Sequence, residues 1–188
     1  MANSLFDFIQ QQVPLSDAEI QALTGIVVNV QAPSGAELSK KNTYCRDLYF
    51  ITKGLVKLCF DSDGKEFIMR FFEEEVLFTD LESWNKKQSS EYKIIALENI
   101  EFITIPLLQF EQLCSKHHGL EMFYRRMMTR ASLNMMDRIK EILEEDAKKR
   151  YSNFIKNHPT LLQRISLGDL SKYLGITQVS LSRIRADK

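Results

Sequence analysis

The sequence predicts an α+β fold in which an antiparallel, jelly-roll-like β-roll is followed by one long helix and a small C-terminal helical unit. Short pieces rich in β-branched and aromatic residues fill residues 26–105, whereas apolar residues recur at helical spacing after Pro106. With 188 residues and 44% apolar content, the chain can bury a substantial core but is short for more than two modest domains. We therefore expect a roll over residues 1–118, a long helix over 119–145 and a helical unit over 146–188.

A short helix is predicted after Pro14. Ser16 is a suitable N-cap, and Glu19 follows it by three residues, which is the spacing of a capping box. The first ten residues, MANSLFDFIQ, lack the basic segment and the apolar stretch of a signal peptide, and no apolar run is long enough to span a bilayer. We therefore expect a cytoplasmic protein with no membrane contact.

Four pieces of the next region read as strands: LYFITKG, LVKLCF, EFIMRFF and YKIIAL. Between the second and third pieces, Asp63-Gly64 offers the positive-φ residues that a tight β-hairpin requires. Several short strands at this spacing indicate an antiparallel sandwich or roll.

The long helix is predicted from a seam of apolar residues spaced by three or four positions. The seam consists of Leu120, Tyr124, Met128, Ala131, Met135, Ile139 and Ile142. Such a seam can pack on the β-domain of the same chain. However, further apolar residues lie beside it, namely Phe123, Met127, Met136 and Leu143. This is more apolar surface than one small domain covers, so the pattern favours a homodimer through this helix.

The C-terminal unit has the spacing of a helix-turn-helix. Its aliphatic positions would form a shared core: Leu170, Leu174, Ile176, Leu181 and Ile184. Ser171 is small enough for two helices to cross closely, Gly175 suits the turn, and Thr177 can cap the second helix. A helical hairpin without function would match fewer of these positions.

In such a motif the second helix enters the major groove of DNA and presents its N-terminal residues to the bases. Gln178 can pair with adenine, Arg183 with guanine or phosphate, and Val179 can contact a thymine methyl. We expect cations nearby to contact the DNA backbone. The candidate DNA-binding residues are Thr177, Gln178, Val179, Ser182, Arg183, Arg185, Lys172 and Lys188.

The charge distribution agrees with this interpretation. Residues 148–188 contain nine Lys or Arg and two Asp, a formal balance of +7, while the whole chain has a net charge of zero. A basic end on an acidic body is typical of a nucleic-acid-binding unit joined to another domain, although a solvated basic face would look the same.

Several stretches resemble the Crp/Fnr superfamily of transcription regulators. YFITKGLVKL followed by DGKE is similar to the core of its β-roll, and RYSNFIKNHPTLLQRISLGDLSKYLGITQVSLSRIR to its DNA-binding end. The resemblance implies a cyclic-nucleotide-binding-type sensor domain, a dimerisation helix and a DNA-binding domain. It also implies a dimer on double-stranded DNA with a two-fold operator, with RNA polymerase as a partner. Many relatives continue into a two-stranded wing, whereas only three residues follow Arg185 here, so we expect no C-terminal wing.

The resemblance also identifies a candidate effector pocket. Relatives that bind cyclic AMP carry a phosphate-binding cassette similar to G-E-L followed by R-S-A, whose arginine neutralises the phosphate. An ungapped alignment places Thr79, Asp80 and Leu81 at the first motif, Ser90, Glu91 and Tyr92 at the second, and Met135 and Met136 where the base is held. Because the arginine is replaced by serine beside an acid, we expect no cyclic AMP binding. Either the pocket takes a less anionic ligand or its own side chains close it.

Other functions have little support in the sequence. The cysteines, Cys45, Cys59 and Cys114, are far apart and form no CxxC motif, so neither a disulfide framework nor a metal site is expected. Neither a catalytic triad pattern, nor a Walker loop, nor an HExxH motif occurs, and we expect neither an enzyme nor a cofactor. Two function classes remain: a DNA-binding regulator, or a small-molecule-binding module that acts through a protein partner without DNA.

Overall fold

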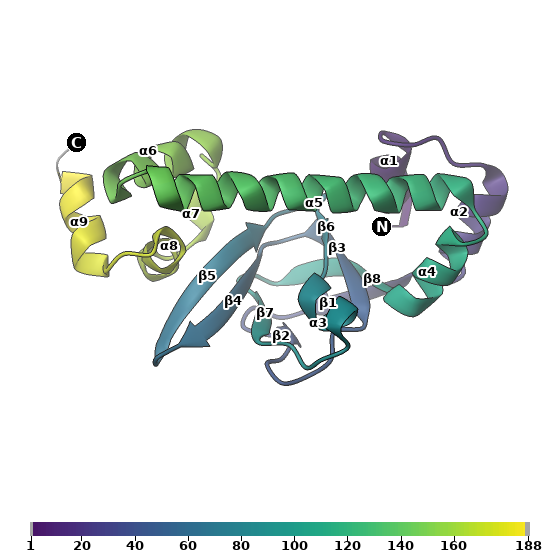
Figure 1. Ribbon diagram of the computed structural model, residues 1–188, viewed down its shortest axis with the longest axis horizontal. Helices are drawn as coiled ribbons and strands as arrows, with labels where there is room; N and C mark the ends of the chain where they lie inside the picture. The colour runs from purple at the N-terminus through teal and green to yellow at the C-terminus, as the bar shows by residue number, and fades with distance from the viewer. Residues whose placement is uncertain (1, 187–188) are drawn as a thin grey trace.

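The computed structural model describes residues 2–186, and its centre is a β-roll made of two four-stranded sheets (Figure 1). Across the first sheet the order is β1 (Val28–Ala32), β8 (Ile100–Pro106), β3 (Asp47–Lys53) and β6 (Leu77–Phe78). Across the second it is β2 (Glu37–Ser39), β7 (Tyr92–Ala96), β4 (Val56–Ser62) and β5 (Lys65–Phe72). All neighbouring strands are antiparallel, as the sequence predicts.

The predicted hairpin joins β4 to β5. Asp63 and Gly64 have φ values of 50° and 72°, and Ser62 pairs with Lys65 on either side of them. Two consecutive positive φ values are characteristic of the type I′ turn, whose twist matches that of paired strands. We refer to β4, β5 and this turn as the β4–β5 hairpin.

Aromatic side chains fill the interior of the roll. The rings of Phe72 and Phe78 stack with centroids 3.8 Å apart, and Tyr49 packs against both Phe78 and Phe102. These side chains belong to one buried cluster together with Ile51, Val56, Ile94 and other residues from both sheets. The space between the two sheets is therefore occupied by the protein's own side chains.

Helices cover one end of the roll. They are α1 (Ala2–Gln10), α2 (Asp17–Thr24) and α4 (Leu107–Cys114), and they share a core with the first part of α5 (His118–Glu144). The sequence did not predict α1, although Leu5 and Ile9 are fully buried in this core.

The capping box before α2 is confirmed and also reaches α5. The Ser16 hydroxyl accepts the backbone N–H of Glu19, and the Glu19 carboxylate accepts the backbone N–H of Ser16 at 2.8 Å. The same carboxylate accepts the N–H of Gly119, in the first turn of α5, at 2.7 Å. A Cβ at Gly119 would lie 2.7 Å from the Glu19 oxygen, so glycine permits this contact. The hydrogen bonds, led by that from Ser16, outweigh desolvation and lower the pKa of Glu19.

The long helix α5 runs across the whole molecule above the roll (Figure 1). Its apolar seam has two different environments. Leu120 is fully buried in its own domain, so its assignment to a dimer contact is wrong, whereas Tyr124 packs on the ring of Phe110 and stays partly exposed. Phe123 is likewise buried in this core. Beyond residue 132 the helix leaves the core, and its apolar side chains are exposed.

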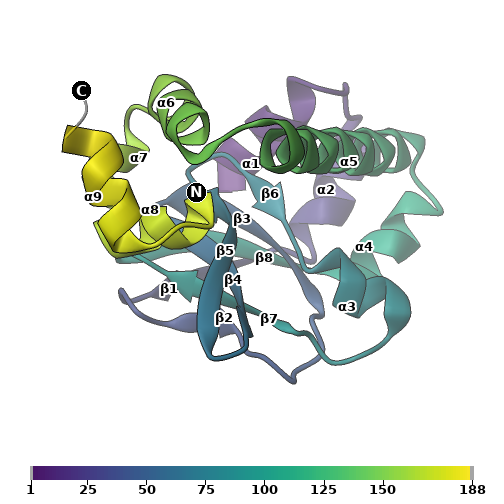
Figure 2. The ribbon, with the colours of Figure 1, turned by 60° about the vertical axis from the view of Figure 1, so that its left-hand side comes forward.

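The C-terminal unit consists of α6 (Ala147–Asn157), α7 (Leu161–Arg164), α8 (Leu167–Leu174) and α9 (Gln178–Ala186). It is docked on the outer face of the β4–β5 hairpin, seen beside α8 in Figure 2. Its buried residues form one cluster with residues of the roll, including Leu55, Cys59, Ile68 and Phe71. Within residues 2–186, no helix is both long and apolar enough to cross a membrane.

Candidate nucleic-acid interface and effector pocket

Local hydrogen bonds build α8 and α9 as a helix-turn-helix. The Ser166 hydroxyl accepts the N–H of Asp169 at 2.9 Å and starts α8, which ends at Gly175 with a φ of 68°. The Thr177 hydroxyl then accepts the N–H of Ser180 at 3.1 Å, as expected for the cap of α9. Ser171 is buried, and its hydroxyl donates to the carbonyl of Gly168. The expected roles of Ser171, Gly175 and Thr177 in the fold of the motif are confirmed.

The aliphatic core of this motif is confirmed too. Leu170, Leu174 and Leu181 are buried, while Ile176 and Ile184 are partly buried against the same cluster. Because α9 packs through Leu181 and Ile184, its opposite face is directed away from the protein.

The outward face of α9 carries the predicted reading residues. Gln178, Val179, Ser182 and Arg183 are exposed, with Val179 exposed to 62%. At about 100° per residue these four side chains fall within an arc of about 140°. In Figure 1, α9 lies at one end of the molecule, beyond the end of α5.

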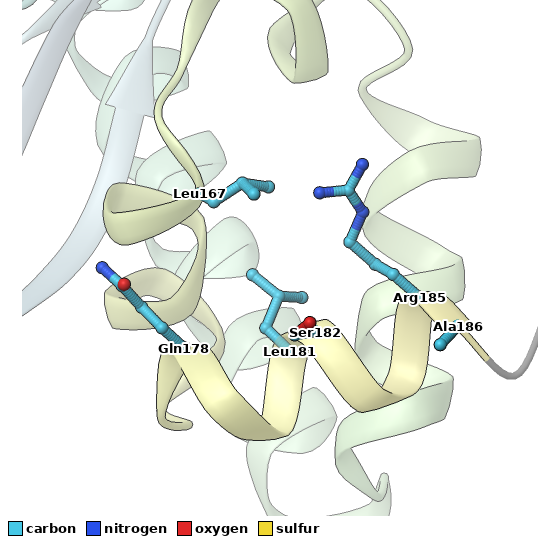
Figure 3. Close-up of a pocket in the computed structure, with 6 residues that line it drawn as sticks. All are labelled: Leu167, Gln178, Leu181, Ser182, Arg185 and Ala186. Atoms are coloured by element: carbon cyan, nitrogen blue, oxygen red, sulfur yellow. The ribbon is translucent and has the colours of Figure 1, made fainter.

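A groove runs along one edge of this face (Figure 3). It has a volume of about 410 Å³ and is lined by Leu167, Gln178, Leu181, Ser182, Arg185 and Ala186. Arg185 extends toward Leu167 across the groove (Figure 3), whereas Arg183 is not among the lining residues. Arg183 and Arg185 therefore lie on opposite sides of the outward face of α9.

Two residues that the sequence did not single out shape this groove. Leu167 forms one wall, and a Cβ added at Gly168 would lie 2.8 Å from the side-chain nitrogen of Gln178. Ser166 and Asp169 have the spacing of a helix N-cap. This spacing could have indicated from the sequence that Leu167 and Gly168 begin a helix.

The structure pairs one predicted DNA-binding residue with the roll. The Nζ of Lys172 lies 3.0 Å from Glu66 of β5, and 41% of the Lys172 side chain is exposed. Its expected contact with the DNA backbone stays a prediction. Lys188 lies outside the described residues.

The candidate effector pocket is small. A cavity of about 70 Å³ lies beside α3 (Leu81–Lys86) and is lined by Asp80, Glu82, Ser83, Gln88, Ser89, Ser90, Glu91 and Tyr92. Thus Asp80, Ser90, Glu91 and Tyr92 are brought together as expected. Thr79 and Leu81 are not among the lining residues, and the Thr79 hydroxyl donates to the carbonyl of Asp47 instead.

Met135 and Met136 do not belong to this pocket. They lie on the exposed part of α5, where 47% and 64% of their surface is accessible, and neither contributes to the cavity wall. The structure therefore does not bring these two residues to the cavity, and their expected role in holding a base stays a prediction.

One carboxylate in the wall of the pocket is already hydrogen-bonded to the protein. Asp80 caps α3 by accepting the N–H of Ser83 at 3.1 Å, and its second oxygen accepts the hydroxyl of Ser90 in a short hydrogen bond. Both Asp80 and Ser90 are buried. Glu82 and Glu91 add two more acids at the cavity wall. An anionic ligand would meet several negative charges here and no cation within the wall.

The thiols and the acidic side chains offer little further chemistry. Burial raises the pKa of Cys59 to about 12, so this thiol stays protonated and poorly nucleophilic. Across residues 2–186 there is no group of three or more His, Cys, Asp or Glu side chains placed to hold a metal ion.

Comparisons with known proteins agree with this architecture. Residues 29–117 match the family model described as the cyclic nucleotide-binding domain. FixK2 from Bradyrhizobium japonicum superposes with a TM-score of 0.75 at 15% identity, covering 86% of this chain and 84% of that protein. A putative transcriptional regulator of the Crp/Fnr family from Eubacterium rectale gives 0.73 at 16% identity, covering 90% and 82%. CLP, described as a c-di-GMP responsive global regulator in Xanthomonas campestris, gives 0.72 at 13% identity, covering 92% and 91%. A search of curated protein sequences found no match.

The roll, the long helix and the helix-turn-helix are therefore arranged as in these solved structures, and this is the fold that the resemblance seen in the sequence implies. Within this fold, residues 29–117 are the part that matches the cyclic nucleotide-binding domain model.

Proposed function

We propose that this chain is a dimeric transcription regulator of the Crp/Fnr type that binds a two-fold operator in double-stranded DNA. The observation that carries the proposal is the exposed face of α9, which a capped glycine turn holds at the free end of the molecule. Gln178 and Arg183 supply amide and guanidinium groups for base edges, and Val179 supplies an apolar contact. No enzymatic activity is part of this proposal.

The exposed part of α5 supports a homodimer. Its large apolar side chains include Met135, Met136, Ile139, Ile142 and Leu143, all between 47% and 79% exposed. At about 100° per residue they fall within an arc of about 120°, which is a continuous strip along the helix. Two copies that pack strip on strip would bury this surface and place two α9 helices at the same end of the dimer.

The pocket supports a regulator that does not respond to cyclic AMP. Asp80 already caps α3 and accepts the Ser90 hydroxyl, so the site holds its own anion. The aromatic stack of Phe72 and Phe78 fills the interior of the roll. In this proposal the pocket either takes a small uncharged or cationic effector or needs none, and RNA polymerase is the protein partner of the DNA-bound dimer.

DNA selection and mobility-shift assays test the proposal. Purified protein would be mixed with random-sequence DNA, and the selected fragment would be titrated at salt concentrations between about 50 and 200 mM. A regulator should show steep salt dependence and a large preference over competitor DNA. We expect Arg183→Ala to weaken specific binding by about 1–3 kcal/mol. Lys86→Ala, which removes an exposed ion pair on α3, is the matched control and should leave binding unchanged.

The alternative is a binding module that acts through a protein partner without DNA. It predicts that no fragment is selected at about 50 mM salt, where even nonspecific binding is strong. That result would reject the regulator proposal.

A further inference from the structure

Four charged side chains join α8 to the β4–β5 hairpin in an alternating chain. The Nζ of Lys57 on β4 lies 2.9 Å from a carboxylate oxygen of Glu66 on β5 and 2.9 Å from one of Asp169 on α8. The Nζ of Lys172 on α8 lies 3.0 Å from the same oxygen of Glu66. Asp169 and Lys172 are one helical turn apart, so both ends of this chain of charges hold α8.

Three of these four charges are shielded from water, while Lys172 is 41% exposed. The side chains of Lys57, Asp169 and Glu66 are only 10%, 15% and 18% exposed. Desolvation alone would raise the pKa of Glu66, but the ammonium groups of Lys57 and Lys172 outweigh it and lower the pKa to about 2. A buried charge that loses its partner is costly, so removal of one member should release the contact.

A second cluster fixes the chain immediately before α8. The guanidinium of Arg164 donates to both oxygens of Glu74 at 2.9 Å and to both oxygens of Glu98 at 2.9 and 2.8 Å. Glu74 also accepts the N–H of Gly54, which ties it to the backbone of the roll. Two bidentate pairs on one guanidinium define both its position and its plane.

Apolar contacts fill the space between the two clusters. Phe71 of β5 packs on the rings of Tyr173 and Phe154, with centroids 5.4 and 6.4 Å away. The guanidinium of Arg138 on α5 also stacks on the ring of Tyr173 at 4.0 Å and donates to the backbone carbonyl of Tyr173. Thus one ionic cluster joins α8 to the roll and a second joins the residue Arg164 before it. The C-terminal end of α8 is joined to α5 through Arg138.

We propose that Lys57, Glu66, Glu74 and Glu98 are positioning residues for DNA recognition, because the roll sets the direction of α9 through α8. The proposal rests on the proposed function. In a dimer, the separation of the two α9 helices is defined only if each is rigid relative to α5, and none of the four residues needs to touch DNA. No effector is required for this attachment.

The test measures tolerance to the spacing between operator half-sites. The operator selected by the wild-type protein would be modified by inserting two base pairs at its centre, which rotates the half-sites by about 70°. The variants are Glu66→Lys, and the double variant Glu74→Gln with Glu98→Gln. All these substitutions are in the roll and leave every residue of the helix-turn-helix unchanged. Glu37→Gln, at an exposed position of β2 away from both clusters, is the control, and melting temperatures identify any variant that does not fold.

We expect the wild-type protein and Glu37→Gln to prefer the original operator at least about tenfold over the modified one. For the positioning variants, this ratio should fall below about threefold while binding to a single half-site is retained. Equal losses at both spacings, or an unchanged ratio in both variants, would overturn the inference. If the wild-type protein selects no operator, the proposed function itself fails, which is a different result. If Glu66→Lys does not fold, the double variant Glu74→Gln with Glu98→Gln still tests the inference.

Discussion

The hydroxyl of Ser90 donates to the carboxylate of Asp80 across ten residues of sequence, at the position that the family resemblance assigns to a phosphate-binding arginine. The same carboxylate caps α3 through the N–H of Ser83. One acidic side chain therefore takes up the hydrogen-bond donors that would otherwise receive an anion.

We expect Asp80→Ala to lower the free energy of unfolding by about 1–3 kcal/mol, because it removes a helix cap and a buried charge-assisted hydrogen bond. Glu82→Ala, two residues further on, is the control. Glu82 is exposed and pairs only at the surface, so its loss should cost less than about 0.5 kcal/mol. Urea denaturation of both variants measures the difference, and equal values would contradict the assigned role of Asp80.

Cyclic AMP should not bind. At millimolar concentration it should leave the melting temperature and the DNA affinity unchanged, because Asp80, Glu82 and Glu91 surround a cavity of about 70 Å³. Isothermal calorimetry checks this directly, and a dissociation constant in the micromolar range would refute it.

Acid should weaken the attachment of α8 through Glu66. The pKa of this carboxyl falls from 4.5 to about 2 on folding. Its contribution is therefore complete above about pH 4.5 and is lost as the pH falls from there toward 2. Glu66→Gln should be less stable than wild type at pH 7, and the difference should shrink toward pH 3. Thermal melts across this range measure it, with Glu37→Gln, an exposed site on β2, expected to show no such convergence.

The apolar strip of α5 makes a separate prediction. Met136→Glu and Leu143→Glu should each shift the protein from dimer to monomer, because a carboxylate would have to lose its water in the interface. Asp137→Asn also changes the charge by one unit but lies about 160° from the centre of the strip, and it should stay dimeric. Sedimentation at several concentrations distinguishes these outcomes. A wild-type protein that is already monomeric would remove the basis for a two-fold operator.

Replacing Gly175 by a residue with a side chain should lower the free energy of unfolding. Its φ of 68° disfavours an L-residue, although nothing lies within 4 Å of an added Cβ. Gly175→Ala should therefore cost about 1–2 kcal/mol, and Gly175→Asn less, since asparagine adopts this conformation more readily. Gly25→Ala is the control, because Gly25 has a φ of −67° and its Cβ would make only ordinary contacts. Equal costs at the two positions would mean that φ is not the deciding factor.

Features with a local cause were predictable from the sequence. The capping box of Ser16 and Glu19, the Asp63-Gly64 hairpin and the turn at Gly175 each depend on residues a few positions apart. The alternating and helical periods then gave the order of the elements. By contrast, α3 is a six-residue helix, too short to show a period.

The features that the sequence did not predict are contacts between distant segments. Lys172 pairs with Glu66, which is 106 residues away, and no sequence pattern marks such a pair. The seam of α5 has one continuous period, yet Leu120 faces the core of its own domain while Ile139 is exposed. Periodicity identifies the apolar side of a helix, but the partner of that side depends on how the rest of the chain folds.

The shared cluster beneath α8 has a consequence for protein engineering. Phe71, Ile68 and Cys59 of the roll pack in one cluster with Leu170, Leu174 and Leu181 of the C-terminal helices. The C-terminal helices therefore cannot be transferred to another protein as an independent unit. If these residues were fused to an unrelated domain, their buried apolar side chains would be exposed to water. A stable chimaera would need to include the β4–β5 hairpin as well. The C-terminal helices and the roll share one hydrophobic cluster, so natural variation on one side of it should be matched by compensating changes on the other.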